Sequence, residues 1–219
     1  MKKETEIKTK RMLIRPMSDQ EIEMRMETSG SDELRAAYGE MLSGCRSDPD
    51  NRVWYAPWKM TVRADHTDIG DLGFKGAARE SAVEIGYGVL PEYEGNGYMT
   101  EAVKAMTQWA FGNSDVAFVE AETEPDNKAS QRVLEKCGFT PDGVGKEGPR
   151  FVLERPLSNL TTTCMLFGLS VGTALGSVFG SIGIGASMGL CFGMCVGTAF
   201  DSSAKKKRKE LREQRRERK

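Results

Sequence analysis

A glycine-bearing turn near the middle of the chain carries residue types that bind phosphate. Residues 84–101 read EIGYGVLPEYEGNGYMTE, in which an alternating strand runs into Pro91, the turn Gly-Asn-Gly occupies 95–97, and a helix begins near Thr100. The first N–H groups of a helix have no partner within it, and the helix dipole places partial positive charge there. Glycine lets the backbone approach an anion closely. The turn predicts a site for a phosphate-bearing ligand, with a plain strand-turn-helix connection as the alternative.

A second strand-to-helix connection, at residues 116–138, adds information on which kind of phosphate-bearing ligand binds. The pattern G-x-G-x-x-T lacks the third glycine of a dinucleotide-binding fingerprint. After a helix over 101–111 and a predicted strand over 116–123, the residues Pro-Asp-Asn at 125–127 open another helix, KASQRVLEKCGF, which Gly138 ends. Two strand-to-helix connections in this order are more specific than either one alone.

Together, the blocks GVLPEYEGNGYMTEA and N-x-x-S-x-R-V-L-E-K-C-G-F resemble the Gcn5-related N-acetyltransferase (GNAT) superfamily, most closely its ribosomal-protein-alanine acetyltransferase branch. The resemblance covers residues 8–157. It implies an α/β (α+β) fold with a mixed central sheet and flanking helices. It also implies an enzyme that transfers acetyl from acetyl-CoA to a primary amine, on a protein N-terminus or a small molecule, by direct attack.

The resemblance assigns the binding of acetyl-CoA to two segments. The end of the strand at 88–90 splays from its neighbour and pairs with pantetheine, and one N–H there polarises the thioester carbonyl. The turn cradles the pyrophosphate, and the start of the second helix meets the pantetheine arm. The residues so assigned are Gly88, Val89, Leu90, Glu94, Gly95, Asn96, Gly97, Tyr98, Met99, Thr100, Asn127 and Ser130.

Catalysis requires an amine without its extra proton, and a carboxylate can remove that proton if burial raises its pKa. Glu84 occupies the position of the general base in some members of the superfamily. The carboxylates at 120, 122 and 124 are alternatives that could act through a water. The resemblance places Ser130 near the point where the thiolate leaves. The single histidine, His66, reads as a loop residue, so no histidine triad or histidine metal cluster is available, and we expect no metal.

Three positions depart from the pattern of the superfamily. Glu94 stands where Gln, Arg or an aromatic residue is usual, Met99 where Gly or Ala is usual, and Leu134 where many members have a tyrosine acid. These departures favour an alternative function, a catalytically weak acyl-CoA-binding domain attached to a membrane scaffold or oligomer.

The rest of the first 158 residues fits one domain. Strands are predicted over 10–16, 68–75, 82–90 and 151–157, and a polar helical region over 18–42, which Ser18-Asp19 caps. Aromatic residues at 54, 55 and 58 could line an acceptor pocket, but a packed core is the favoured interpretation.

The composition changes completely after residue 158. Residues 156–200 contain no charged side chain, and glycines recur every four residues at 168–180 and again at 185–197. Such spacing puts small residues on one helical face, which suits close packing in lipid. The segment resembles glycine-zipper membrane segments. We predict a two-helix transmembrane hairpin within 159–201, spanning roughly 163–181 and 185–200. A re-entrant hairpin and a flexible linker are the alternatives.

The last segment, 202–219, is a basic tail. Its final 15 residues carry ten basic and three acidic side chains, which leaves a net charge of −8 for residues 1–204. A basic tail beside a hydrophobic hairpin predicts that both termini and the enzyme domain are cytoplasmic. No signal peptide is expected. The expected partners are acetyl-CoA, an amine acceptor, the lipid bilayer and copies of the chain packed through glycine faces. The acidic domain gives no reason to expect nucleic acid, although the tail leaves ribosome or nucleic-acid contact as an alternative.

Overall fold

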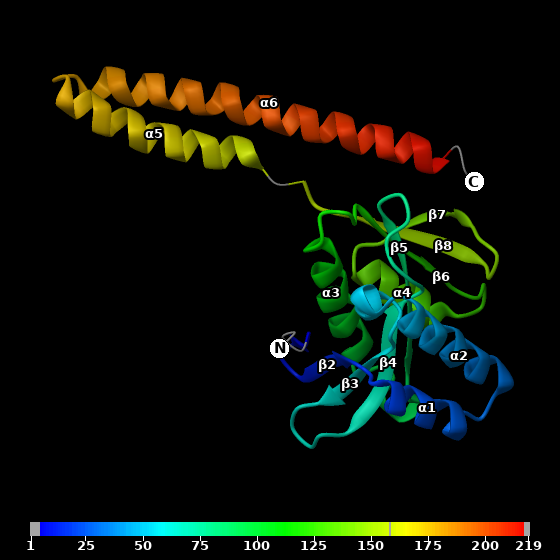
Figure 1. Ribbon diagram of the computed structural model, residues 1–219. Coiled ribbons are helices and arrows are strands. Elements are labelled where there is room, and N and C mark those ends of the chain that lie inside the picture. Colours follow the sequence, from blue (N-terminus) through cyan, green and yellow to red (C-terminus); the bar gives the residue numbers. More distant parts are fainter. Residues whose placement is uncertain (1–4, 158, 217–219) are drawn as a thin grey trace. The chain divides into compact units, whose positions relative to one another are not determined.

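A computed structural model describes residues 5–157 and 159–216 (Figure 1). The chain forms two compact units, one ending at Arg155 and the other beginning at Pro156. The boundary that the sequence predicts, at 158/159, lies within a few residues of this division, and residue 158 itself is outside the described residues.

The first unit is built on one eight-stranded sheet, counted within the described residues, in the order β1-β2-β3-β4-β5-β6-β8-β7. All neighbouring strands are antiparallel except β5 and β6. The sheet is therefore mixed, as the sequence predicts. The strands are β1 (Ile7–Lys8), β2 (Met12–Pro16), β3 (Trp58–Val62), β4 (Asp68–Phe74), β5 (Ala82–Val89), β6 (Phe118–Glu122), β7 (Thr140–Val144) and β8 (Pro149–Glu154).

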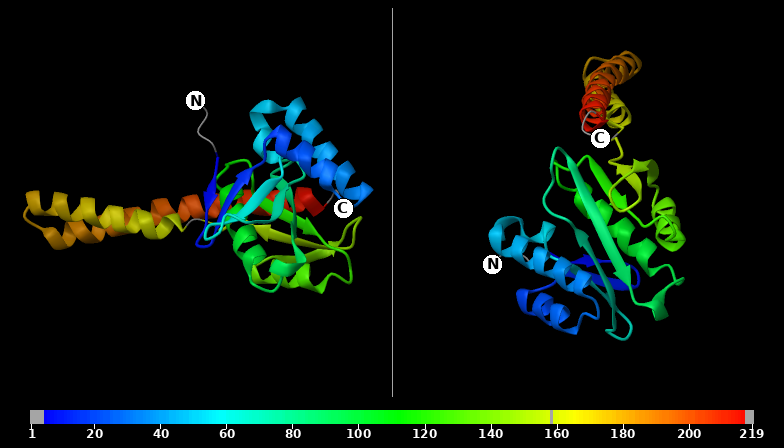
Figure 2. Two further views of the ribbon diagram at one scale, coloured as in Figure 1. Left: turned by 90° about the horizontal axis from the view of Figure 1, so that it is seen from below. Right: turned by 90° about the vertical axis from the view of Figure 1, so that its right-hand side faces the viewer.

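Helices cover both faces of this sheet. In the right-hand view of Figure 2, α1 and α2 lie on one side of the strands and α3 and α4 on the other. The helical elements of this unit are α1 (Asp19–Thr28), α2 (Asp32–Ser47), the 3-10 turns η1 (Pro49–Trp54) and η2 (Pro91–Tyr93), α3 (Tyr98–Phe111) and α4 (Lys128–Lys136). The single helical region expected over 18–42 is thus two helices. Ser18 caps the first with a capping box, and Ser31 caps the second.

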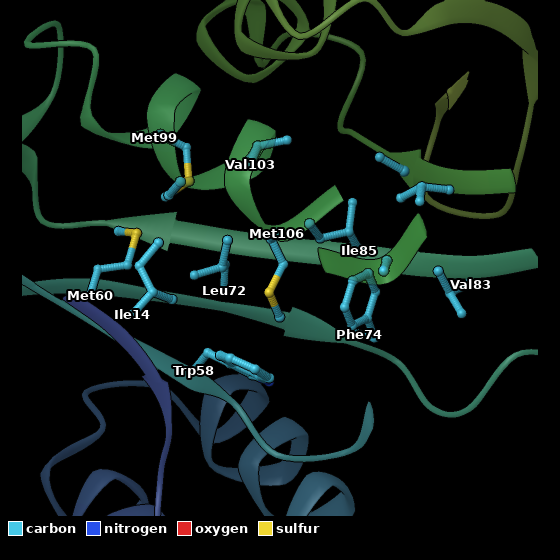
Figure 3. Packing of buried hydrophobic residues seen from close by; sticks show 14 of the residues in the cluster. Ile14, Trp58, Met60, Leu72, Phe74, Val83, Ile85, Met99, Val103 and Met106 are labelled. Carbon is cyan, nitrogen blue, oxygen red and sulfur yellow. The ribbon is translucent and has the colours of Figure 1, made fainter. Parts of the chain in front are cut away.

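The main core lies between the sheet and α3. Met99, Val103 and Met106 on α3 point at the strand residues Leu72 and Ile85 (Figure 3). These five side chains are at most 6% exposed. Alternate strand residues face this layer, which follows from the two-residue repeat of a strand.

Trp54 and Trp58 confirm the core interpretation of the aromatic cluster. They are 5% and 0% exposed and pack against Trp109, with ring centroids 4.8 and 5.0 Å away.

Strand β7 was not predicted, because Pro141 and Gly143 are residue types that strands disfavour. His66 lies in the turn between β3 and β4 with a φ of 60°, as expected of a loop residue.

The second unit is a pair of helices, α5 (Leu160–Val178) and α6 (Ile182–Arg216). Seven of the eight regularly spaced glycines lie at the contact between them. An added Cβ would overlap the opposite backbone: at Gly189, for example, it would meet the carbonyl oxygen of Gly168. The eighth, Gly180, instead forms the turn, with a φ of 71°.

Both helices are long and apolar enough to cross a membrane by length and composition. The basic residues at 205–216 do not form a separate segment, because α6 continues through them without interruption. Just before these basic residues, at the open end of the pair, the Asp201 carboxylate accepts hydrogen bonds from the N–H groups of Leu160 and Thr161, at 3.0 and 3.1 Å. It caps the start of α5 from across the hairpin.

We predict that Gly189→Ala separates α5 from α6, because the new methyl group has no space between the backbones. Amide hydrogen exchange, measured by mass spectrometry on the detergent-solubilised chain, should accelerate in both helices while the sheet is unchanged. Gly183→Ala is the matched control, since its Cβ would meet nothing within 4 Å. Equal exchange rates in the two variants would contradict this packing.

Candidate functional site

The site is formed where two neighbouring strands separate. β5 and β6 pair in parallel only from Ala82 to Glu84, opposite 118–120. Beyond that point β5 stays paired with β4, and β6 with β8. A gap therefore opens beside the second half of β5.

The N–H of Val89 points into this gap. The next residue, Leu90, donates its N–H to the carbonyl of Ile69 at 2.8 Å, on the β4 side. Because successive residues of a strand direct their N–H groups to opposite edges, Val89 must direct its own away from β4. An oxygen atom bound in the gap would find a donor there.

The glycine turn closes one end of the gap. Gly95 and Gly97 have φ angles of 74° and 76°, a left-handed conformation that favours glycine. Gly97 is the N-cap of α3 and brings no side chain to the first turn of the helix. The N–H groups at the start of α3 are therefore directed at the space beside the turn, which gives it the character of an anion site.

Arg11 holds this turn in place, a role that the sequence did not reveal. Its Nε donates to Glu101 at 2.8 Å, its backbone N–H donates to the same carboxylate at 2.9 Å, and its Nη1 donates to the carbonyl of Asn96 at 2.9 Å. The guanidinium also lies 4.3 Å from the ring centre of Tyr98. One side chain thus fixes both the turn and the first turn of α3.

A cavity of about 400 Å³ lies over the gap and the turn. It brings together ten of the twelve residues predicted to bind acetyl-CoA. Leu90 and Asn96 do not line it; the Asn96 side chain instead donates to the Glu94 carbonyl at 3.0 Å. The predicted residues that line the cavity are Gly88, Val89, Glu94, Gly95, Gly97, Tyr98, Met99, Thr100, Asn127 and Ser130.

Two of these residues have structural tasks that were not predicted. Met99 is 6% exposed and packs in the core, so its bulk is directed away from the turn. Asn127 caps α4, because its Oδ1 accepts the N–H of Ser130 at 2.9 Å. Its amide N–H₂ remains the part that could reach a ligand.

Basic residues on α4 also line the cavity. Arg132 and Lys136 stand four residues apart, on one face of the helix. They add positive charge to a site that otherwise contains the carboxylate of Glu94. Their spacing was visible in the sequence, but no argument from the sequence alone pointed that face at the turn.

Ser130 has a partner that the sequence did not suggest. The hydroxyls of Tyr87 and Ser130 lie 2.9 Å apart. Burial raises the pKa of Tyr87 to about 12, although the hydrogen bond to Ser130 opposes the shift. Leu134, the position at which the resemblance would place a tyrosine acid, is fully buried. The pair therefore places a protonated hydroxyl, that of Tyr87 on β5, beside Ser130 on α4.

Glu84 lies on the other face of β5 from Tyr87, in an ion pair. Its carboxylate is 2.5 Å from Lys75 Nζ, which also binds Glu147 at 2.9 Å. Burial, which lowers the pKa of Lys75, is outweighed by hydrogen bonds to these two carboxylates, so the pKa is raised. The assignment of the base to Glu84 stays a prediction, but the Glu84 carboxylate is already bound by the ammonium of Lys75.

The alternative carboxylates follow the same strand edge. Glu120 pairs with Glu84 in the β5–β6 register. Glu122 accepts the N–H of Glu147 at 3.1 Å. Glu124 is exposed in the loop before α4. Over residues 5–157 and 159–216, no cluster of three or more His, Cys, Asp or Glu residues could hold a metal ion.

Comparisons with known proteins agree with this geometry. Residues 8–140 match the family described as "Acetyltransferase (GNAT) domain". The chain is 28% identical over 149 residues to the uncharacterized N-acetyltransferase YoaA of Bacillus subtilis, across 63% of this chain and 84% of that protein. It is 40% identical over 63 residues to the probable N-acetyltransferase YjcK of Bacillus subtilis, across 29% of this chain and 35% of that one.

Solved structures share the fold of the first unit. A putative ribosomal-protein-serine acetyltransferase from Vibrio cholerae superposes with a TM-score of 0.56 at 19% identity, over 71% of this chain and all of that one. The ribosomal L7/L12 alpha-N-protein acetyltransferase RimL, in complex with coenzyme A, superposes with a TM-score of 0.53 at 15% identity, over 68% of this chain and 98% of that one.

We predict that Arg11→Lys weakens the binding of acetyl-CoA about tenfold, because a lysine cannot bond Glu101 and the Asn96 carbonyl with one planar group. Isothermal titration calorimetry gives the dissociation constant. Arg79→Lys, at an exposed position on the β4–β5 turn, is the control and should bind as the unaltered chain does. Unchanged affinity in Arg11→Lys would show that the turn holds its shape without the guanidinium.

Proposed function

This chain belongs to the GNAT family and is an N-acetyltransferase, and we propose that it transfers acetyl from acetyl-CoA to the primary amine of a protein N-terminus or a small molecule. The observation that carries the proposal is the gap between β5 and β6, closed by a glycine turn at the start of α3. A helix N-terminus with Arg132 and Lys136 nearby fits the negative charge of a phosphorylated cofactor.

The gap supplies the groups that acetyl transfer needs. The Val89 N–H is directed where it could donate to the thioester carbonyl oxygen, which gains negative charge as the amine adds. The hydroxyl of Ser130, supported by Tyr87 at 2.9 Å, could give a proton to the leaving thiolate. A fixed donor on one side and a proton source on the other favour direct transfer to the amine.

The cysteines of the first unit support direct transfer rather than an acyl-enzyme. Burial raises the pKa of Cys137 to about 11, and burial also raises the pKa of Cys45. Only the thiolate is a good nucleophile, so both thiols are poorly reactive at neutral pH.

We further propose that α5 and α6 tether the enzyme to a bilayer, with both termini and the acetyltransferase unit in the cytoplasm. Exposed apolar residues, including Phe167, Phe179 and Phe192 at 72–81% exposure, cover the outer surface of the pair. The glycine faces already pack against each other within the chain. An oligomer would therefore form through these outer apolar faces rather than through the glycines.

A second candidate function is a weakly active acyl-CoA-binding domain on a membrane scaffold. The observation that favours it is the exposed carboxylate of Glu94 in the wall of the cavity, where it repels a phosphate. Tight binding of acetyl-CoA without release of CoA on any amine would favour this candidate over the enzyme.

We predict that Ser130→Ala lowers kcat by about 10²-fold, because a positioned proton donor contributes on this scale, while the affinity for acetyl-CoA changes less than twofold. Release of CoA, followed with a thiol reagent, measures the rate. Ser114→Ala, in the exposed turn after α3, is the control. A kcat equal to that of the control would remove Ser130 and its tyrosine partner from the proton transfer.

We predict that the full chain sediments with membranes and that a chain ending at Asn159 stays soluble, because the shortened chain lacks both apolar helices. Fractionation after carbonate extraction makes the measurement. Recovery of both chains in the soluble fraction would overturn the membrane proposal and leave the transferase proposal intact.

A further inference from the structure

A partly buried carboxylate that the sequence did not single out, Asp71, lies beside the gap on the face of β4 that α2 covers. Resting on the acetyl transfer proposed above, we propose that Asp71, held by Tyr38, takes the proton from the acceptor amine, and that the amine enters over Gly86 and Gly88. The inference replaces Glu84 in this role and assigns the acceptor path to the face of the sheet that α1 and α2 cover.

Asp71 stands beside the reacting end of β5. It pairs with Gly88 in the β4–β5 register, and residues paired across antiparallel strands have Cα atoms only about 5 Å apart, with side chains on the same face. Gly88 precedes Val89, whose N–H points into the gap. The carboxylate of Asp71 and the proposed oxyanion donor therefore meet at one level of the sheet.

Gly86 and Gly88 leave the backbone of β5 uncovered by side chains next to the Asp71 carboxylate. A Cβ added at Gly86 or Gly88 would meet nothing within 4 Å. By contrast, a Cβ at Gly73, the register partner of Gly86, would lie 3.2 Å from the carbonyl oxygen of Ala56. Open space thus lies specifically over the half of β5 that borders the gap, and a slender amine can reach the backbone there.

Tyr38 orients the carboxylate and leaves one of its oxygens available. The phenol on α2 donates to Asp71 Oδ2 at 2.7 Å, and within the described part of the chain it is the one group that hydrogen-bonds this side chain. Burial and the neighbouring charge of Asp71 raise the pKa of Tyr38, so the phenol keeps its proton and remains the donor. Asp71 Oδ1 can then accept a proton from the amine.

The charged groups around Asp71 leave it suited to proton transfer. Burial raises its pKa, and the hydrogen bond from Tyr38 and the charge of Arg25 on α1 partly oppose the shift. Lys59, its register partner on β3, directs its ammonium to Glu21 and Asp68, at 3.1 and 3.2 Å. A carboxyl with a raised pKa is a better base near neutral pH than an ordinary one.

Glu84 meets these requirements less well. It lies four residues before Gly88, roughly 13 Å along an extended strand, and its carboxylate is bound by Lys75. The cluster of Glu84, Lys75 and Glu147 instead joins β4 and β5 to the β7–β8 turn.

The proton and electron balance is simple. The acceptor ammonium gives one proton to Asp71 Oδ1, and the freed lone pair forms the N–C bond to the acetyl carbon as the C–S bond breaks. Ser130 gives its proton to the leaving thiolate, and the nitrogen loses a second proton, which returns through water to Ser130. Asp71 returns its proton to solvent.

The test is Asp71→Asn in the full chain, with Asp65→Asn, at an exposed position in the β3–β4 turn, as the matched control and Glu84→Gln as the variant of the rival base. The assay measures CoA release with an alanine-initiated peptide, spermidine and an amino sugar as acceptors. We expect Asp71→Asn to lower kcat/KM at least about 100-fold, within the range of a general base, with the acetyl-CoA dissociation constant within twofold. Asp65→Asn should stay within threefold of the unaltered chain, and Glu84→Gln should lose less activity than Asp71→Asn.

Tyr38→Phe supplies a second readout that does not depend on the folding of Asp71→Asn. The base acts as a carboxylate, so kcat/KM falls as the pH drops through its pKa. Because the Tyr38 hydrogen bond lowers that pKa, its removal should move the acid limb of the pH profile to higher pH.

The outcomes separate the two proposals. A larger loss in Glu84→Gln than in Asp71→Asn, or an acid limb unmoved in Tyr38→Phe, overturns the role of Asp71 while acetyl transfer stands. Acetyl-CoA binding with no turnover of any acceptor by the unaltered chain overturns acetyl transfer, and the role of Asp71 with it.

Discussion

The parting of β5 from β6 is the constraint on which the rest of the first unit depends. Two parallel strands that stopped sharing hydrogen bonds would normally leave buried N–H and C=O groups without partners. Here β5 remains bonded to β4, and β6 to β8, so each strand is held from its outer side and the inner edges are left for a ligand. The Val89 N–H, the bare glycines and the cavity all follow from this one separation.

The two faces of β5 divide the chemistry between them. Odd-numbered residues of β5 such as Tyr87 face α3 and α4, where the cavity of about 400 Å³ lies. Even-numbered residues face α1 and α2, where Asp71 is bonded by Tyr38. Two reactants can thus approach β5 from its opposite faces. Side chains alternate between the two faces, so each reactant meets its own set of side chains, while both meet the same strand backbone.

Sequence patterns predicted the order of most elements and most of the residues that line the cavity, because turns, caps and glycines act over a few residues. The burial of Trp54 and Trp58 was predictable for the same local reason. Contacts between distant segments were not. Arg11 lies 90 residues from Glu101 and Tyr38 lies 33 residues from Asp71. No local pattern in the sequence around these residues identifies the partner. β7 escaped because Pro and Gly weaken any strand signal.

The continuity of α6 changes what its basic end can do. A helix of 35 residues is about 52 Å long, whereas the hydrocarbon layer of a bilayer is about 30 Å thick. If Asp201 marks the bilayer surface, the charges beyond it stand on a rod instead of a loose chain. Electrostatic attraction fades over about 8 Å in physiological salt. If the helix stands upright, only the lysines at 205–207 are therefore close enough to the headgroups to be attracted by them. The arginines further along the helix would then stand beyond the reach of this attraction.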